Sequence, residues 1–249
     1  MERGFTLVEI AIVVLVLGIL LASLLGPLSV RIEQQEIRKT TDQMEEIKEA
    51  LYGYAMANGA LPCPDVNNNG TQDRTGSPEI CSLDAGNIPW VDLGVPGLDA
   101  WNRAFRYRVT GYFADQFGVD GSGNLIPPTV TPPPACTATP AQTSFALCTD
   151  GGITVRDGDG GNVVAAKVAG VVISHGKYRF DPASSTDPPS PHEVENFERE
   201  GAASIPGDTL GTVVARGYTG GSGQEYDDLV VWLSANVLKY RLVQAGRLP

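Results

Sequence analysis

The stretch IAIVVLVLGILLASLLGPL, from Ile10 to Leu28, contains no charged side chain, and it decides how the chain is organised. Extended back to Phe5, the apolar stretch contains a single charge, Glu9. A helix of residues 5–28 would be about 36 Å long, enough for a hydrocarbon core about 30 Å thick. A cleaved secretory signal has a basic segment and a shorter apolar run, whereas only Met-Glu-Arg-Gly precedes this one. The sequence therefore predicts a retained transmembrane helix over residues 5–28.

The residues that lead into this run read Gly4-Phe5-Thr6-Leu7-Val8-Glu9. They closely resemble the processing site of type IV prepilins and type II secretion pseudopilins. The resemblance implies a leader peptide of residues 1–4, which a prepilin peptidase/N-methyltransferase removes between Gly4 and Phe5. It also implies N-methylation of Phe5, the new first residue.

The charge of Glu9 inside the apolar run has two interpretations. Because Phe5 and Glu9 are four residues apart, they lie on one face of a helix. In the family that the motif resembles, the glutamate neutralises the Phe5 amine of a neighbouring subunit during assembly, and a buried charge costs less when it is paired. The alternative is that Glu9 reaches the interface of a monomeric anchor and pairs with nothing.

The helical pattern continues beyond the apolar run, over residues 29–58. Apolar residues recur every seven positions at Val30, Ile37, Met44 and Leu51, and charged residues cover the remaining faces. This pattern predicts an amphipathic helix, which Asn58-Gly59 ends. The helix packs either on a globular head or, as the alternative, in a dimeric coiled coil.

The globular head, residues 59–249, is rich in Gly, Pro, Asn and Asp and contains short runs of β-branched and aromatic residues. We expect a closing helix over residues 235–245, with Ser234 as its N-cap and Gly246 just past its end. The expected strands are Phe105–Phe113, Ile153–Arg156, Val163–Ser174 and Leu229–Leu233.

The fold class expected is α+β: a long N-terminal helix, half membrane and half amphipathic, packed on a small antiparallel sheet with long loops. The resemblance implies that this fold is pilin-like. Three further segments of the head look like parts of major pseudopilins: Asp99-Ala-Trp-Asn102, Ser174-His-Gly176 and Tyr226-Asp-Asp-Leu229.

The four cysteines are Cys63, Cys81, Cys136 and Cys148. None forms a CxxC pair, so a zinc knuckle or a redox dithiol is not indicated. An even number of cysteines outside the cytoplasm predicts two disulfides, and four cysteines allow three connectivities. Pairing of sequence neighbours, Cys63–Cys81 and Cys136–Cys148, closes the shorter loops and is favoured.

One loop carries oxygen ligands at calcium-loop spacing. Asp65, Asn67, Asn69 and Asp73 occupy positions 1, 3, 5 and 9, and Gly70 occupies position 6. Position 12, where a bidentate Glu is expected, is Gly76. The hypothesis is calcium bound by the four polar residues, and the alternative is a turn that uses the backbone freedom of Asn and Gly. No other cofactor is predicted.

Composition argues against two classes of function. Eighteen Lys and Arg against 29 Asp and Glu give a net charge of −11, which disfavours non-specific nucleic-acid binding. The chain has two histidines, His175 and His192, and it has no HExxH, P-loop or GxSxG motif. We therefore expect no catalytic residues and no enzyme.

The sequence predicts a prepilin-like structural subunit, a pseudopilin, of a type II secretion or type IV pilus filament. It would sit in the inner membrane as a single-pass protein, with a cytoplasmic N-terminus and a periplasmic head, before it enters the filament. The implied partners are the prepilin peptidase/N-methyltransferase, other pilin or pseudopilin subunits, the inner-membrane assembly platform and the lipid bilayer. The alternative is a monomeric, membrane-tethered periplasmic binding module.

Overall fold

The structure is a computed structural model of the chain. It describes residues 6–76, 79–115, 118–119, 125–126, 145–178, 190–196, 211–219 and 226–248. The chain forms two compact units, Met1–Lys39 and Thr40–Pro249, which we call the N-terminal unit and the larger unit.

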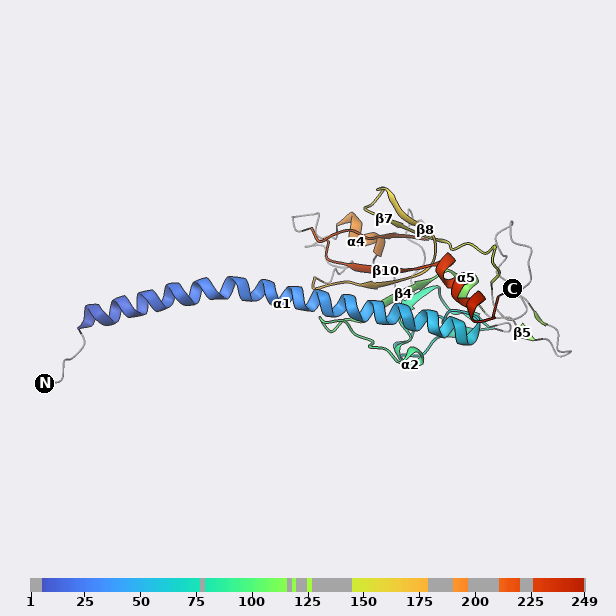
Figure 1. Cartoon of the computed structure of the whole chain (residues 1–249), viewed down its shortest axis with the longest axis horizontal. Coiled ribbons are helices and arrows are strands. Elements are labelled where there is room, and N and C mark those ends of the chain that lie inside the picture. The colour runs from blue at the N-terminus through green and yellow to red at the C-terminus, as the bar shows by residue number, and fades with distance from the viewer. Residues whose placement is uncertain are drawn as a thin grey trace. The chain divides into compact units, whose positions relative to one another are not determined.

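The first element is the long helix α1, Leu7–Asn58 (Figure 1). It ends where the sequence predicts, because Gly59 adopts a left-handed φ of 77° and its N–H bonds to the carbonyl of Ala55 at 2.8 Å. The expected apolar spacing is buried only in the second half of the helix. Met44, Ile47 and Leu51 are at most 1% exposed, whereas Val30 is 54% exposed.

The larger unit contains the other elements. Three of the expected strands are found as β7 (Ile153–Arg156), β8 (Val163–Ser174) and β10 (Leu229–Ser234), and the expected closing helix is α5 (Ala235–Gln244). The expected strand Phe105–Phe113 is confirmed only over β4 (Arg106–Val109), because Gly111–Ala114 forms the short helix α3. The elements after α1 are β1 Arg74–Thr75, β2 Ile80–Cys81, β3 Ala85–Asn87, α2 Trp90–Leu93, β4 Arg106–Val109, α3 Gly111–Ala114, β5 Gly118–Val119, β6 Leu125–Ile126, β7 Ile153–Arg156, β8 Val163–Ser174, α4 Pro191–Asn196, β9 Thr212–Val214, β10 Leu229–Ser234 and α5 Ala235–Gln244.

Strand β8 is the centre of a six-stranded sheet. The strand order is β3-β4-β8-β7-β9, and β10 also pairs with β8. β8 is antiparallel to β4, β7 and β10, but β7 and β9 are parallel, with Thr154 opposite Thr212. The sheet is therefore mixed.

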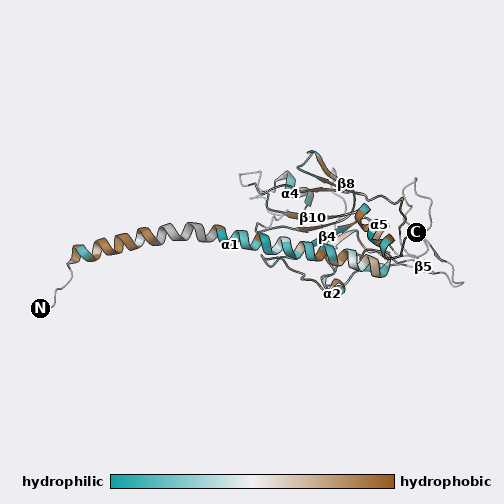
Figure 2. Ribbon diagram, viewed as in Figure 1, coloured by the Kyte–Doolittle hydropathy of each residue, from teal (hydrophilic) through white to brown (hydrophobic). Residues whose placement is uncertain are grey.

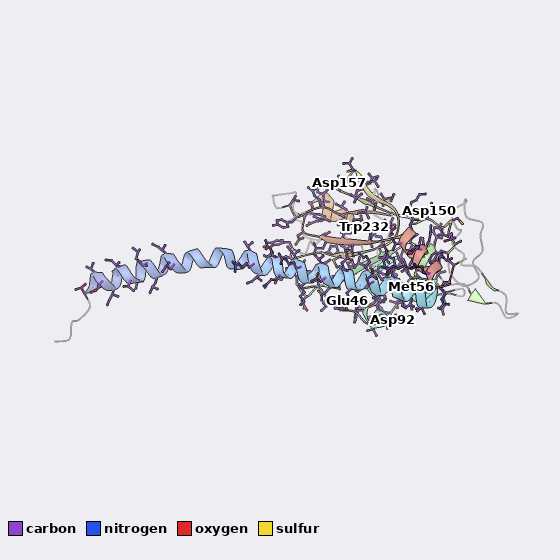
Figure 3. The ribbon with its side chains drawn as sticks, in the orientation of Figure 1. Glu46, Met56, Asp92, Asp150, Asp157 and Trp232 are labelled. Carbon is purple, nitrogen blue, oxygen red and sulfur yellow. A yellow bond between two sulfur atoms is a disulfide. The ribbon has the colours of Figure 1, made fainter. Side chains whose placement is uncertain are left out.

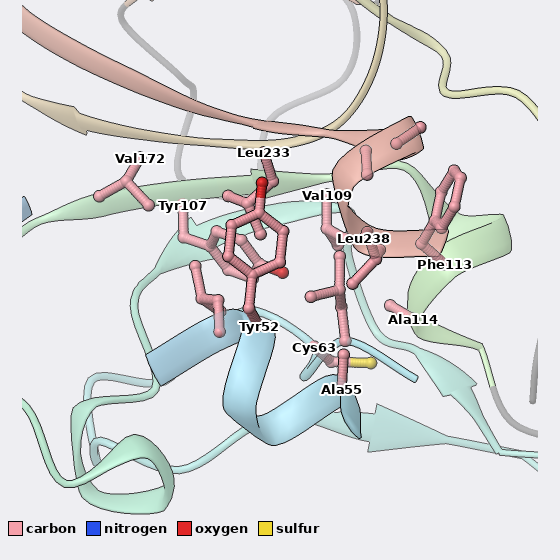
Figure 4. Close-up of a cluster of buried hydrophobic side chains, with 14 of the residues drawn as sticks. Tyr52, Ala55, Cys63, Tyr107, Val109, Phe113, Ala114, Val172, Leu233 and Leu238 are labelled. Atoms are coloured by element: carbon pink, nitrogen blue, oxygen red, sulfur yellow. The ribbon is translucent and has the colours of Figure 1, made fainter. Parts of the chain in front are cut away.

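Apolar side chains gather in two clusters. One cluster joins the second half of α1 to β4, β8, β10 and α5, and Figure 4 shows Tyr52, Tyr107, Leu233 and Leu238 at its centre. The other contains Ile153, Val155, Val168, Val171, Ile173 and Val213. Because neighbouring side chains of a strand point to opposite faces, Val171 and Val172 of β8 belong to different clusters.

Two expectations are wrong. The pilin-like fold class, with its small antiparallel sheet, is overturned by the six-stranded mixed sheet that dominates the larger unit. The prediction missed β3 and β9, which have three residues each. The sequence of β3, Ala-Gly-Asn, has no β-branched or aromatic residue, and β9 pairs with β7, which lies far away in the sequence.

The second wrong expectation is the single-pass inner-membrane localisation, with residues 5–28 as the transmembrane helix. Within the described residues, no helix combines enough length with enough apolar character to cross a bilayer.

Candidate functional site

The start of α1 exposes apolar side chains on every side. Figure 2 shows this stretch as predominantly hydrophobic, and Figure 3 shows its side chains projecting on both sides of the ribbon. All of the large apolar residues here are between 48% and 86% exposed: Leu7, Val8, Ile10, Ile12, Val13, Val14, Leu15, Val16, Leu17, Ile19 and Leu20. A helix that is apolar all round is normally buried, so this surface is a candidate for association.

Thr6 and Glu9 begin this helix as a reciprocal pair. The backbone N–H of Glu9 donates to the hydroxyl of Thr6 at 3.3 Å, and the N–H of Thr6 donates to the Glu9 carboxylate at 3.5 Å. This is a capping box, in which two backbone donors at a helix start are satisfied by side chains. The sequence contains the signal for this capping box, a Thr followed three residues later by a Glu, in addition to the resemblance that predicts a role for Glu9 in assembly.

Gly4 and Phe5, the predicted sites of cleavage and N-methylation, lie outside the described residues. The intersubunit pairing of Glu9 with Phe5 therefore stays a prediction.

The predicted calcium loop is folded around the carboxylate of Asp65, which is 0% exposed. Its Oδ1 accepts the N–H groups of Asn67 at 3.1 Å and Asn69 at 3.3 Å. Its Oδ2 accepts the N–H of Gly70 at 2.8 Å, and Gly70 has a left-handed φ of 86°. Asp73 closes the loop by accepting a hydrogen bond from the Asn67 amide at 2.6 Å.

The structure thus brings Asp65, Asn67, Asn69 and Asp73 together. Backbone and amide N–H groups donate to the side-chain oxygens of all four, as the alternative of an Asn/Gly turn also requires. No group of three or more His, Cys, Asp or Glu side chains in the described part of the chain has the geometry of a metal site. Calcium binding at this loop stays a prediction.

The cysteine prediction is confirmed for one pair. Cys63 and Cys81 form a disulfide with a sequence separation of 18 residues. Cys148 is also disulfide-bonded, and Cys136 lies outside the described residues.

The three segments that looked like parts of major pseudopilins meet in the larger unit. Ser174 donates to the Asp99 carboxylate at 2.6 Å, and this carboxylate also accepts the N–H groups of Trp101 and Arg103, both at 2.9 Å. The Nδ1 of His175 lies 3.1 Å from Oδ1 of Asp228.

Asn196, which the sequence did not single out, is bonded to Asp228 in the same region. Its amide donates to Oδ2 of Asp228 at 2.9 Å and to the carbonyl of Val214 at 2.8 Å. The Tyr226 hydroxyl donates to the same carbonyl at 2.7 Å, and burial raises its pKa above the ordinary value. Asn196 lies in α4, far from these partners in the sequence, so no local pattern could have identified it.

Comparisons with known proteins add no relative. No family model matches the chain, and neither the curated proteins nor the solved structures contain a match.

Proposed function

We propose that the chain is a prepilin-like structural subunit that polymerises through its N-terminal helix, in a filament of the type II secretion or type IV pilus kind. The observation that carries the proposal is the exposed apolar surface of Leu7–Leu20. Water disfavours such a surface, and burying it between subunits stabilises an assembly by roughly 25 cal/mol per Å².

Processing precedes assembly in this proposal. A prepilin peptidase/N-methyltransferase cuts between Gly4 and Phe5, which removes four residues and creates a new amine near Glu9. The carboxylate of Glu9 then exchanges its bond to Thr6 for a charged partner on a neighbouring copy. The resemblance of Gly4–Glu9 to the prepilin processing site supports this order of events.

The experiment identifies the N-terminal residue of the protein purified from its native source. Mass spectrometry should find N-methylated Phe5 as the first residue. Gly4→Ala should leave the chain unprocessed, whereas Gly18→Ala, a matched change where an added Cβ meets no atom within 4 Å, should not. A purified chain that still begins with Met1 contradicts the proposal.

The role of Glu9 in assembly is tested by comparing the filament yields of two variants. Glu9→Gln should be processed but should reduce filament formation, because the amide cannot neutralise an amine. Glu46→Gln removes an exposed carboxylate from the amphipathic part of the same helix and is the control. Equal filament yields from both variants would argue against a role for Glu9 in assembly.

A further inference from the structure

The turn His175–Tyr178 follows β8 and is anchored by side chains from other segments. Arg103 donates to the carbonyl of His175 at 3.2 Å and to the carbonyl of Lys177 at 2.6 Å. Gly176 has a left-handed φ of 53°, and a Cβ added there would lie 2.6 Å from Oδ2 of Asp227. The turn therefore closes tightly against Asp227.

Asp227 is an anchor with only one of its oxygens satisfied. Its Oδ2 accepts the N–H of Tyr178 at 2.7 Å. Its Oδ1 is buried and has no hydrogen-bond partner within the described part of the chain. A buried carboxylate oxygen without a donor is unfavourable while the group is ionised, and a proton on that group reduces the cost of burying it.

The charges around Asp227 are mixed. Asp228, the next residue, is 5% exposed and repels a second negative charge on Asp227. The Nδ1 of His175 lies 3.1 Å from Oδ1 of Asp228. Arg103 favours the ionised form of Asp227, as do the backbone N–H groups of the turn. Lys177, in the turn, is exposed. Burial outweighs these groups and raises the pKa of Asp227 to about 6.

We infer that Asp227 is a proton-operated latch on the His175–Tyr178 turn, which closes when the carboxyl group is protonated and opens more readily when it is ionised. When the turn opens, water reaches the carboxylate and its pKa falls toward the ordinary value of 3.8. Because the closed state then has the higher pKa, closure is favoured at low pH, and that advantage is lost as the pH rises through about 6.

The measurement is amide hydrogen exchange at Tyr178 in the full chain, corrected for the intrinsic exchange rate. With pKa values of about 6 closed and 3.8 open, the opening equilibrium constant should rise about tenfold between pH 5 and pH 7. Asp227→Asn should make this constant the same at both pH values. Asp157→Asn is the matched control, because Asp157 caps a separate exposed turn through Asn162 and its pKa is lowered.

Two further outcomes decide the inference. His175→Gln should retain the pH dependence; if it removes the dependence while Asp227→Asn keeps it, the latch is His175 and the inference is wrong. Carbon-13 NMR of the native chain gives the titration of Asp227 without any substitution. A midpoint near 6 supports the latch, and a midpoint below about 4.5 overturns it.

Discussion

Arg241 of α5 and Glu49 of α1 are 192 residues apart in sequence and are joined by two hydrogen bonds, of 2.6 and 2.9 Å. The Arg241 guanidinium also lies 4.4 Å from the centroid of the Tyr52 ring. Arg241 therefore links α5, the last helix of the larger unit, to the part of α1 that belongs to that unit.

Removing the contacts of Arg241 with Glu49 and Tyr52 should lower the free energy of unfolding of the larger unit. Arg241→Ala loses a two-point ion pair and a cation–π contact, which together are worth about 1 kcal/mol at a partly exposed site. Arg241→Lys should recover part of this loss, because a lysine keeps the charge but not the fork geometry.

Urea unfolding monitored by circular dichroism measures both variants. Lys48→Ala is the control, since Lys48 pairs with Glu45 on the surface of the same helix and should contribute less than about 0.5 kcal/mol. If Arg241→Ala costs no more than the control, the contacts of Arg241 do not stabilise the fold.

The same pair predicts a pH dependence. The hydrogen bond from Arg241 lowers the pKa of Glu49 below 4.5. A carboxyl group with a lowered pKa contributes stability above its unfolded pKa and loses that contribution as the pH falls through its folded pKa. The stability difference between the native chain and Glu49→Gln should therefore be present at pH 7 and shrink below about pH 4.5; a difference that grows on acidification contradicts the pairing.

Leu51 tests the core beneath α1. It is 0% exposed, so Leu51→Ala should cost about 2–5 kcal/mol through lost burial and the cavity left behind. Val237→Ala removes an apolar side chain that is 41% exposed on α5 and should change the free energy of unfolding by less than about 0.5 kcal/mol. Similar costs for the two variants would place Leu51 outside the core.

The Cys63–Cys81 disulfide should stabilise the loop that it closes. The two cysteines are separated by 18 positions, and closing a loop of this size in the unfolded chain raises the free energy of unfolding by about 3 kcal/mol. The double variant Cys63→Ser/Cys81→Ser should unfold at correspondingly lower urea, and Ser82→Ala, an exposed change beside it, should not. An unchanged midpoint in the double variant would mean that the loop is held by its hydrogen bonds alone.

Local patterns predicted much of the fold. β8 is rich in Val, Ala and Ile, and α5 lies between Ser234 and Gly246, so each could be located without knowledge of its neighbours. β9 has three residues, and its parallel partner β7 lies more than fifty positions earlier, so no pattern in the neighbouring residues predicts this strand. The error in fold class came from the same source, since parallel pairing is a non-local property.

In the candidate site too, the local features could be predicted from the sequence and the contacts between distant segments could not. The apolar run and Glu9 are visible in the sequence, because both are local. The contact between Ser174 and Asp99 and the buried amide of Asn196 depend on how distant segments meet, and no spacing rule predicts them. The oxygens of the Asp65 loop have ligand-like spacing, but sequence could not show that backbone N–H groups occupy them.

In the proposed filament, the exposed apolar part of α1 drives assembly. Val13→Glu/Leu17→Glu places two charges four residues apart, on one face of this stretch. Thr41→Glu adds one charge to an exposed position in the second half of α1 and is the matched control.

Sedimentation of the processed full-length chain measures assembly most directly. The native chain and Thr41→Glu should sediment as polymers, and Val13→Glu/Leu17→Glu should sediment as a monomer with unchanged circular dichroism. A native chain that sediments as a monomer, or a double variant that polymerises as well as the control, would contradict assembly through this helix.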